Sequence, residues 1–171
     1  VIATGAIPRI PDIPGIDDGN VVTTLEVLGG EKEVGDRVVI VGGGMIGCEV
    51  AEHLAEKGKQ VTIIEMLERI GTDIGMTTRW VIMQRLRNAG IRMETKAKAE
   101  ELTDKGVVAS RDGSTEFFAA DSIVVAMGLV PQNELYRRLE AKGTKCYSIG
   151  DCNEAQKILQ AIEDGHRIAG E

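Results

Sequence analysis

The chain has 171 residues, a length that fits one main domain with a small appendage. Its formal net charge of −7 argues against nucleic acid or an anionic membrane as the main partner, because both favour proteins with a surplus of Lys and Arg. No apolar run approaches the ~20 residues of a membrane span and no secretion signal opens the chain, so we expect a soluble, cytoplasmic protein.

The first residues are expected to connect to the main domain rather than to form part of it. Residues 1–35 contain Pro11, Pro14 and Gly15 close together, which predicts a segment with little regular structure. The sequence also starts at Val1, inside an apolar stretch and without an initiator Met. We therefore expect it to be a fragment of a longer protein.

From residue 37 onward the pattern predicts a strand, a helix and a second strand. Val38–Val41 is a run of apolar residues on both faces, as in a central strand of a parallel sheet. After Gly44, apolar residues recur on one helical face until Gly58 ends the helix. Val61–Ile64 then gives another buried strand, and such a parallel crossover is almost always right-handed.

The next segments predict a helix, a strand and a small antiparallel meander. Residues 76–89 carry an amphipathic helical pattern, and the strand Ile91–Thr95 follows it. Between about 98 and 121, short β segments alternate with turn sequences such as Asp112-Gly113. The pattern predicts an antiparallel meander in this part of the chain.

The last third predicts two more buried strands and a helix. Residues 122–128 and 146–151 each repeat an apolar run that ends in glycine, and residues 155–169 show helical periodicity. The predicted fold class is α/β, with a Rossmann-like parallel sheet flanked by helices and a small antiparallel β-meander.

A glycine-rich turn lies directly between the first predicted strand and its helix. Its first glycine permits a tight turn, its second lets a pyrophosphate approach the backbone, and its third lets the helix pack close to the strand. The N-terminus of the helix then supplies amide donors to the anion. We predict a dinucleotide site at these six residues: Gly42, Gly43, Gly44, Met45, Ile46 and Gly47.

A carboxylate at the end of the second strand indicates which dinucleotide is bound. Glu65 stands roughly 20 residues beyond the turn, where a carboxylate accepts hydrogen bonds from the adenine ribose, and Met66 follows it as a further cofactor residue. A carboxylate there would repel the 2′-phosphate of NADP, so NAD(H) is the predicted cofactor. Arg69 could instead rotate toward a 2′-phosphate, although a solvated Arg is the favoured interpretation.

Three other groups of residues are candidates for chemistry. Glu49, at the start of the helix, would either face the nicotinamide or be an acid that the helix dipole favours, and both interpretations stay open. His53 and His166 show no arrangement that suggests a triad. We predict no metal site, because the three cysteines, Cys48, Cys146 and Cys152, lack both metal-site spacing and a disulfide framework. We also predict no catalytic side chain, because hydride transfer from a nicotinamide needs no protein nucleophile.

Several ordered motifs carry a resemblance to a known family over essentially the whole chain. They are Val1-Ile-Ala-Thr-Gly-Ala6, Val39 to Glu49, Ala126-Met-Gly128 with Pro131 and Asn133-Glu-Leu135, and Ile149-Gly-Asp151 with Lys157-Ile158 and Ala161-Ile162. With them the chain resembles the enoate reductase and 2,4-dienoyl-CoA reductase group of old-yellow-enzyme-like NADH:flavin oxidoreductases. The wider group with pyridine nucleotide-disulfide oxidoreductase-type FAD/NAD domains shares the glycine turns, but Lys157 to Gly165 resembles the enoate reductases more closely.

The resemblance implies an NAD domain inserted into an FAD domain. Residues 1–33 would be an FAD-domain remnant and linker, residues 34–143 the NAD(H)-binding Rossmann domain, and residues 144–171 a second FAD-domain remnant. By the same resemblance Asp151 contacts FAD, and Glu49 approaches the nicotinamide carboxamide. Gly5 and Gly128 would end the two strands that cross between the domains.

The implied function is an electron-input module in which hydride passes from NADH to FAD. In the intact protein the resemblance implies FAD, FMN and an iron–sulfur cluster, but the sequence lacks the first FAD turn, the cluster cysteines and the FMN barrel. The chain alone is expected to bind the nucleotide without turning over a substrate, and its partners would be the missing FAD and FMN domains. The alternatives are an NADH oxidase or ferredoxin reductase-type flavoprotein domain, and a non-catalytic nucleotide sensor.

Overall fold

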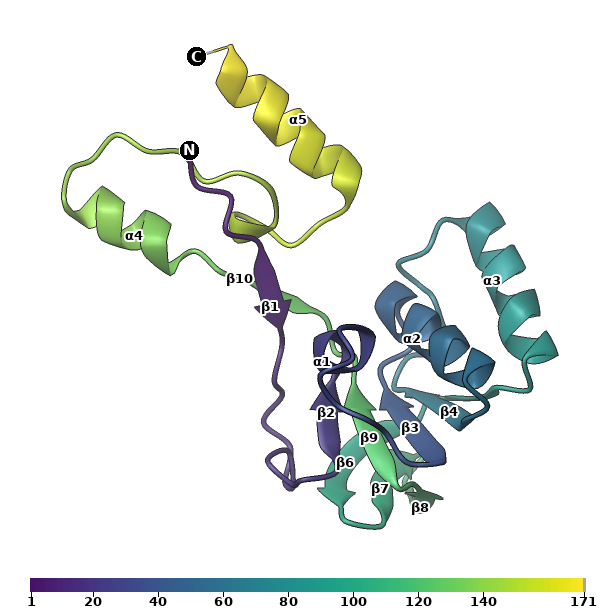
Figure 1. The fold of residues 1–171 in the computed structure, drawn as a ribbon. Helices are drawn as coiled ribbons and strands as arrows, with labels where there is room; N and C mark the ends of the chain where they lie inside the picture. Colours follow the sequence, from purple (N-terminus) through teal and green to yellow (C-terminus); the bar gives the residue numbers. More distant parts are fainter. Residues whose placement is uncertain (171) are drawn as a thin grey trace. The chain divides into compact units, whose positions relative to one another are not determined.

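A computed structural model describes residues 1–170, which divide into two compact units (Figure 1). The larger unit runs from Ile10 to Gly128. The smaller unit joins Val1–Arg9 to the chain from Leu129 onward. These divisions fall at other positions than the predicted remnants, 1–33 and 144–171, whose origin in an FAD domain stays a prediction.

The larger unit is built on a parallel five-stranded sheet. Its strand order is β2-β9-β3-β4-β5, so β9, the last of these strands in the sequence, lies between the first two, β2 and β3. Almost every residue of β3 and β9 is buried, as the continuous apolar runs predict. The strands are β2 (Val21–Thr23), β3 (Arg37–Val41), β4 (Gln60–Glu65), β5 (Arg92–Thr95) and β9 (Ser122–Val125).

Helices cover one face of this sheet. They are α1 (Thr24–Leu28), α2 (Met45–Glu56) and α3 (Met76–Asn88). Alternate strand residues such as Val38 and Ile40 form one core with the buried sides of these helices. Gly58, with φ of +78°, follows the end of α2 in the left-handed conformation expected of a terminating glycine.

A three-stranded antiparallel meander covers the opposite face. Its strands are β6 (Lys98–Thr103), β7 (Gly106–Arg111) and β8 (Ser114–Ala119). Strand residues of the other parity, such as Val39 and Val41, pack with Leu102 and Val107 in a second core. The predicted class is confirmed: an α/β fold with a parallel sheet, helices and a small meander.

The expectation for residues 1–35 is wrong in part. Val21–Thr23 forms the edge strand β2, paired in parallel with β9, and α1 follows it directly. Thr23 and Glu26 form a capping box, in which each side chain accepts from the other residue's backbone N–H. A strand this short has no detectable periodicity, and its partner lies about a hundred residues away along the chain.

The smaller unit contains an antiparallel strand pair and two helices. They are β1 (Ala6–Pro8) with β10 (Leu129–Pro131), α4 (Glu134–Ala141) and α5 (Ile158–Ala169), with a 3₁₀ turn η1 (Gly150–Cys152). The strand predicted over residues 146–151 does not form; Ser148 makes an isolated bridge with Ile2. A single bridge provides too few ladder bonds to define a strand.

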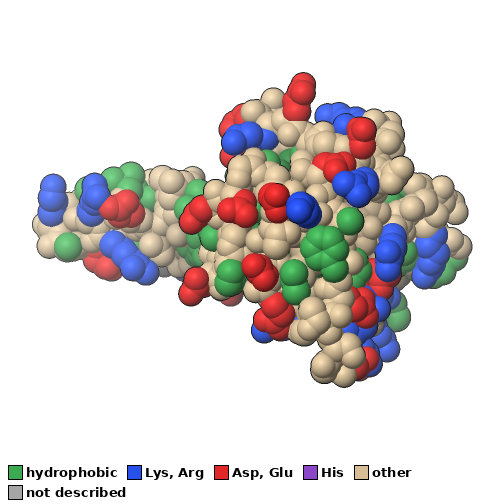
Figure 2. Space-filling view, turned by 90° about the horizontal axis from the view of Figure 1, so that it is seen from below, with side chains coloured by type: hydrophobic (Ala, Val, Ile, Leu, Met, Phe, Trp, Pro, Cys, Tyr) green, Lys and Arg blue, Asp and Glu red, His purple; other side chains and the backbone are tan. Residues whose placement is uncertain are grey.

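The surface carries both signs of charge. On the face that Figure 2 shows, acidic and basic side chains are interspersed, with hydrophobic side chains between them. Within residues 1–170, none of the helices has the length and apolar character that crossing a membrane requires.

Candidate nucleotide-binding site

The glycine turn between β3 and α2 is too close-packed for side chains at two positions. A Cβ on Gly42, whose φ is +114°, would lie 2.3 Å from the carbonyl oxygen of Ala126. A Cβ on Gly47 would lie 2.1 Å from the carbonyl oxygen of Gly42. Both approaches are to backbone atoms, so glycine is required for β3, α2 and the end of β9 to meet here.

The turn leads into the N-terminus of α2. Gly44 is the residue that caps the helix and offers no side chain to accept from the first amides. Met45 and Ile46 are the first two helical residues, and both are partly buried. The amide of Met45 donates to both carboxylate oxygens of Asp73, at 3.1 and 3.0 Å.

Glu65 ends β4 beside the turn. One of its carboxylate oxygens accepts from the amide of Gly43 at 2.8 Å, and the other accepts from the amide of Leu67 at 2.9 Å. The side chain is therefore fixed by the glycine turn on one side and by the following loop on the other. This is the position from which a carboxylate meets the hydroxyls of an adenine ribose in a dinucleotide fold.

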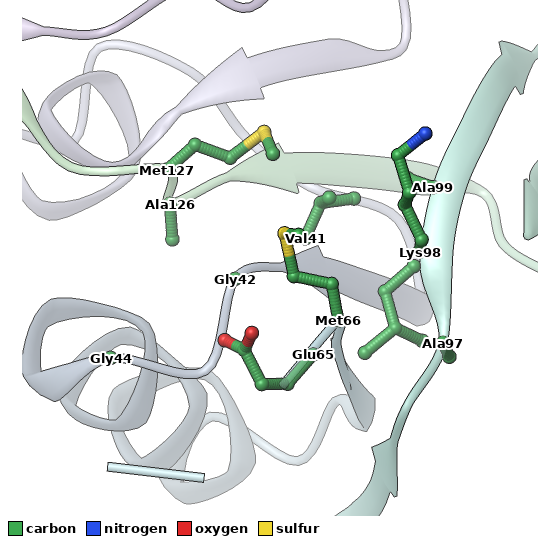
Figure 3. Close-up of a pocket in the computed structure, with 11 residues that line it drawn as sticks. Val41, Gly42, Gly44, Glu65, Met66, Ala97, Lys98, Ala99, Ala126 and Met127 are labelled. Carbon is green, nitrogen blue, oxygen red and sulfur yellow. The ribbon is translucent and has the colours of Figure 1, made fainter. Parts of the chain in front are cut away.

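A cavity of about 230 Å³ opens beside Glu65 (Figure 3). Its walls are mostly apolar: the turn after β3, the end of β4 with Met66, the start of β6, and the segment after β9. The polar side chains at its wall are Glu65 and Lys98. Sequence reasoning did not assign the other lining residues to the site, because the fold brings them there from separate parts of the chain: Val41, Ile64, Ala97, Lys98, Ala99, Ala126 and Met127.

The two cations near Glu65 lie differently. Arg69 lines a separate cavity of about 500 Å³ with Trp80 rather than the cavity of Glu65. Lys98 does line the cavity of Glu65, and its ammonium group lies 3.1 Å from both carboxylate oxygens of Glu100. Of these two cations, Lys98 is therefore the one that lines the same cavity as Glu65.

Glu49 lies farther along α2 than the sequence interpretation assumed. It is exposed and is the fifth helical residue, so the first turn of α2 contains no acidic residue. A charge interacts with the helix dipole mainly within the first turn, so the dipole no longer accounts for Glu49. Its approach to a nicotinamide remains a prediction.

The remaining predicted residues are Gly5 and Asp151, in the smaller unit, and Gly128, the last residue of the larger unit. Gly128, with φ of +89°, immediately precedes β10, and Gly5, with φ of +76°, immediately precedes β1. Asp151 lies in η1, where its carboxylate accepts from the amide of Gln156 at 3.2 Å. It lines a cavity of about 350 Å³ between η1 and the start of α5.

The buried thiol of Cys48 belongs to the packing around the turn. Burial, with nearby acidic residues of which Asp73 is the first, raises the pKa of Cys48 to about 12. The thiol therefore stays protonated and unreactive near neutral pH. Within residues 1–170, no three His, Cys, Asp or Glu side chains gather as metal ligands would.

The chain is similar to known proteins of one family over nearly its whole length. A family model described as pyridine nucleotide-disulphide oxidoreductase matches residues 1–163. The chain is 38% identical over 175 residues to an NADH oxidase of Thermoanaerobacter brockii, covering 99% of this chain and 27% of that protein. It is 33% identical over 172 residues to a cinnamate reductase of Clostridium sporogenes, covering 99% of this chain and 26% of that protein.

A solved structure extends the likeness to three dimensions. The chain superposes on a 2-naphthoyl-CoA reductase with a TM-score of 0.92 and 33% identity, covering 97% of this chain and 26% of that one. The chain thus spans about a quarter of the length of these relatives. It belongs to the pyridine nucleotide-disulphide oxidoreductase family, as an FAD/NAD domain matching part of enoate-type reductases.

Proposed function

We propose that this chain is the NADH-binding electron-input module of a flavin-dependent oxidoreductase. The observation that carries the proposal is the placement of Glu65, which accepts from the amide of Gly43 at 2.8 Å and lines the cavity beside the helix N-terminus. The same corner therefore offers an anion site, a ribose acceptor and an apolar wall.

Each part of the corner has a role toward the dinucleotide. The amides at the start of α2 would hold the pyrophosphate, with Gly44 leaving room for it at the backbone. Glu65 would accept from the ribose hydroxyls, and the cavity walls, including Met66, would receive the adenine. Bound NADH supplies a hydride that a flavin accepts, and the protein's task is to position it.

The parent protein is proposed to be cytoplasmic and of the enoate or dienoyl-CoA reductase type, with FAD, FMN and an iron–sulfur cluster carrying electrons onward. Asp151, in the cavity of the smaller unit, would contact the FAD there, and Gly128 precedes the strand leading into that unit. A contact with further domains is supported by α5, which exposes apolar side chains at Ile158, Leu159 and Ile162. An NADH oxidase is the second candidate, favoured by the likeness to the enzyme of Thermoanaerobacter brockii.

Calorimetric titration with NADH and NADPH tests the nucleotide assignment. We expect wild-type chain to bind NADH at least about tenfold more tightly than NADPH, because the Glu65 carboxylate repels a 2′-phosphate. Glu65→Gln removes that charge and should narrow the preference, whereas Glu101→Gln, at an exposed site on β6, should not. Tighter binding of NADPH, or no binding of either nucleotide to the wild-type chain, would contradict the proposal.

A further inference from the structure

Asp73 occupies the N-terminus of α2, where the proposed function places the pyrophosphate. Its two carboxylate oxygens lie 3.1 and 3.0 Å from the amide nitrogen of Met45, and they also face Gly44. We propose that this carboxylate competes with the dinucleotide pyrophosphate and so sets the affinity of the site. The inference rests on the proposed function and adds a regulating group to it.

The segment that carries Asp73 is held against the glycine turn. The amide of Gly71 donates to the carbonyl of Gly43 at 2.6 Å, and the guanidinium Nε of Arg79 donates to the carbonyl of Ile70 at 2.6 Å. Ile70 and Ile74 are buried, at 3% and 7% exposure. These contacts fix the backbone on both sides of Asp73.

The side chain of Asp73 itself stands at the surface. Because it is exposed, its displacement from the amide of Met45 does not require unpacking of the two buried isoleucines, Ile70 and Ile74. Because the backbone on both sides is fixed, the carboxylate stays within reach of the amide of Met45. The arrangement therefore permits exchange between two anions at one helix terminus.

Competition follows from charge and geometry. The N-terminal amides of a helix attract one anion by their partial positive charge, and Gly44 contributes no side chain that could cap them instead. A pyrophosphate at these amides would meet a second negative charge within a few ångströms, and like charges at that distance repel. Binding must therefore displace the Asp73 carboxylate, which weakens affinity for any ligand that carries the pyrophosphate.

The effect should depend on which part of the ligand is present. Adenosine fills only the cavity beside Glu65, which Asp73 does not line, so its binding leaves the contact between Asp73 and Met45 in place. ADP-ribose and NADH carry the pyrophosphate and must compete for the same amide. Removal of the charge on Asp73 should therefore strengthen binding of ADP-ribose and NADH but not of adenosine.

The test measures dissociation constants of adenosine, ADP-ribose and NADH for three forms of the chain. Asp73→Asn keeps a capping oxygen but removes the charge, and asparagine caps helices as well as aspartate does. Asp104→Asn, in the turn between β6 and β7, makes the same change in net charge away from the site. Thermal unfolding of each form checks that the fold is retained.

We expect Asp73→Asn to bind ADP-ribose and NADH about three- to tenfold more tightly and adenosine within about twofold of wild type. Asp104→Asn should match the wild-type chain for all three ligands. Unchanged or weaker binding of ADP-ribose by a folded Asp73→Asn chain would overturn the competition while leaving the proposed function intact. Failure of every form to bind ADP-ribose and NADH would overturn both.

Discussion

At the scale of single residues, one ion pair joins the starts of two neighbouring strands, β3 and β9. The guanidinium of Arg37 lies 2.6 Å from one carboxylate oxygen of Asp121, and the backbone amide of Arg37 donates to the other at 2.9 Å. The side-chain hydrogen bond, then the backbone one, lowers the pKa of Asp121 to about 2. The pair thus holds the starts of β3 and β9 together, at the end of these strands opposite the glycine turn.

This ion pair predicts a pH dependence of stability. A carboxyl whose pKa is lower in the folded chain stabilises it above the ordinary pKa near 4, and the effect is lost as pH falls toward 2. We expect Asp121→Asn to melt at a lower temperature than wild type at pH 7, with the difference shrinking between pH 4 and pH 2. Thermal unfolding across this range measures it. A difference that is constant with pH would show that the carboxylate's charge is not responsible.

At the same scale, sequence reasoning predicted some of the site and missed the rest for identifiable reasons. Glu65 and the six turn residues could be named from the sequence, because they stand at fixed positions in one consecutive strand, helix and strand. The contact of Asp73 could not, since the loop after β4 folds back onto a helix that precedes it in sequence. Arg69 has the right sequence position for a 2′-phosphate but lines another cavity.

At the scale of elements, the crossing of α2 over the turn depends on Gly47. An alanine Cβ would lie 2.1 Å from a backbone oxygen that cannot move aside, even though alanine is the better helix former. We expect Gly47→Ala to lower the free energy of unfolding by about 1–3 kcal/mol, the usual cost of overpacking. It should also weaken NADH binding, because the turn must shift to relieve the contact.

A matched glycine provides the control for this prediction. Gly19 lies in a loop of the same unit, and a Cβ there would meet nothing within 4 Å, so Gly19→Ala should be neutral or slightly stabilising. Denaturant unfolding followed by the fluorescence of Trp80, on α3, reports on the larger unit for both variants. Equal stability of the two variants would contradict the steric argument.

Elements were predictable where their sequence patterns are local and long. The two strands and the helix between residues 37 and 65 follow from continuous apolar runs and a helical stripe, and the meander follows from its turn at Asp112-Gly113. The strand β2 has three residues and is defined by its pairing with β9. The apolar run at 146–149 failed as a strand because Ile2 alone bridges to it. In both cases the presence or absence of a pairing strand, rather than local sequence preference, determined whether a strand formed.

At the scale of the whole molecule, the proposed chemistry is divided between two units. The larger unit contains the glycine turn, Glu65 and the cavity beside them, so every group proposed to bind NADH lies within residues 10–128. The smaller unit contains Asp151 and its own cavity. Because the chain spans about a quarter of its relatives, the electron acceptor is proposed to lie in the remainder of such a protein.

The central claim is that NADH is held at the corner formed by the glycine turn and the end of β4. Amide chemical-shift mapping of this chain during NADH titration tests it most directly, because each N–H reports on its own surroundings. We expect the largest shifts at Gly43, Met45 and Leu67, whose amides contact Glu65 or Asp73, and small shifts in α4. Shifts confined to the smaller unit, or none at saturating NADH, would contradict the account.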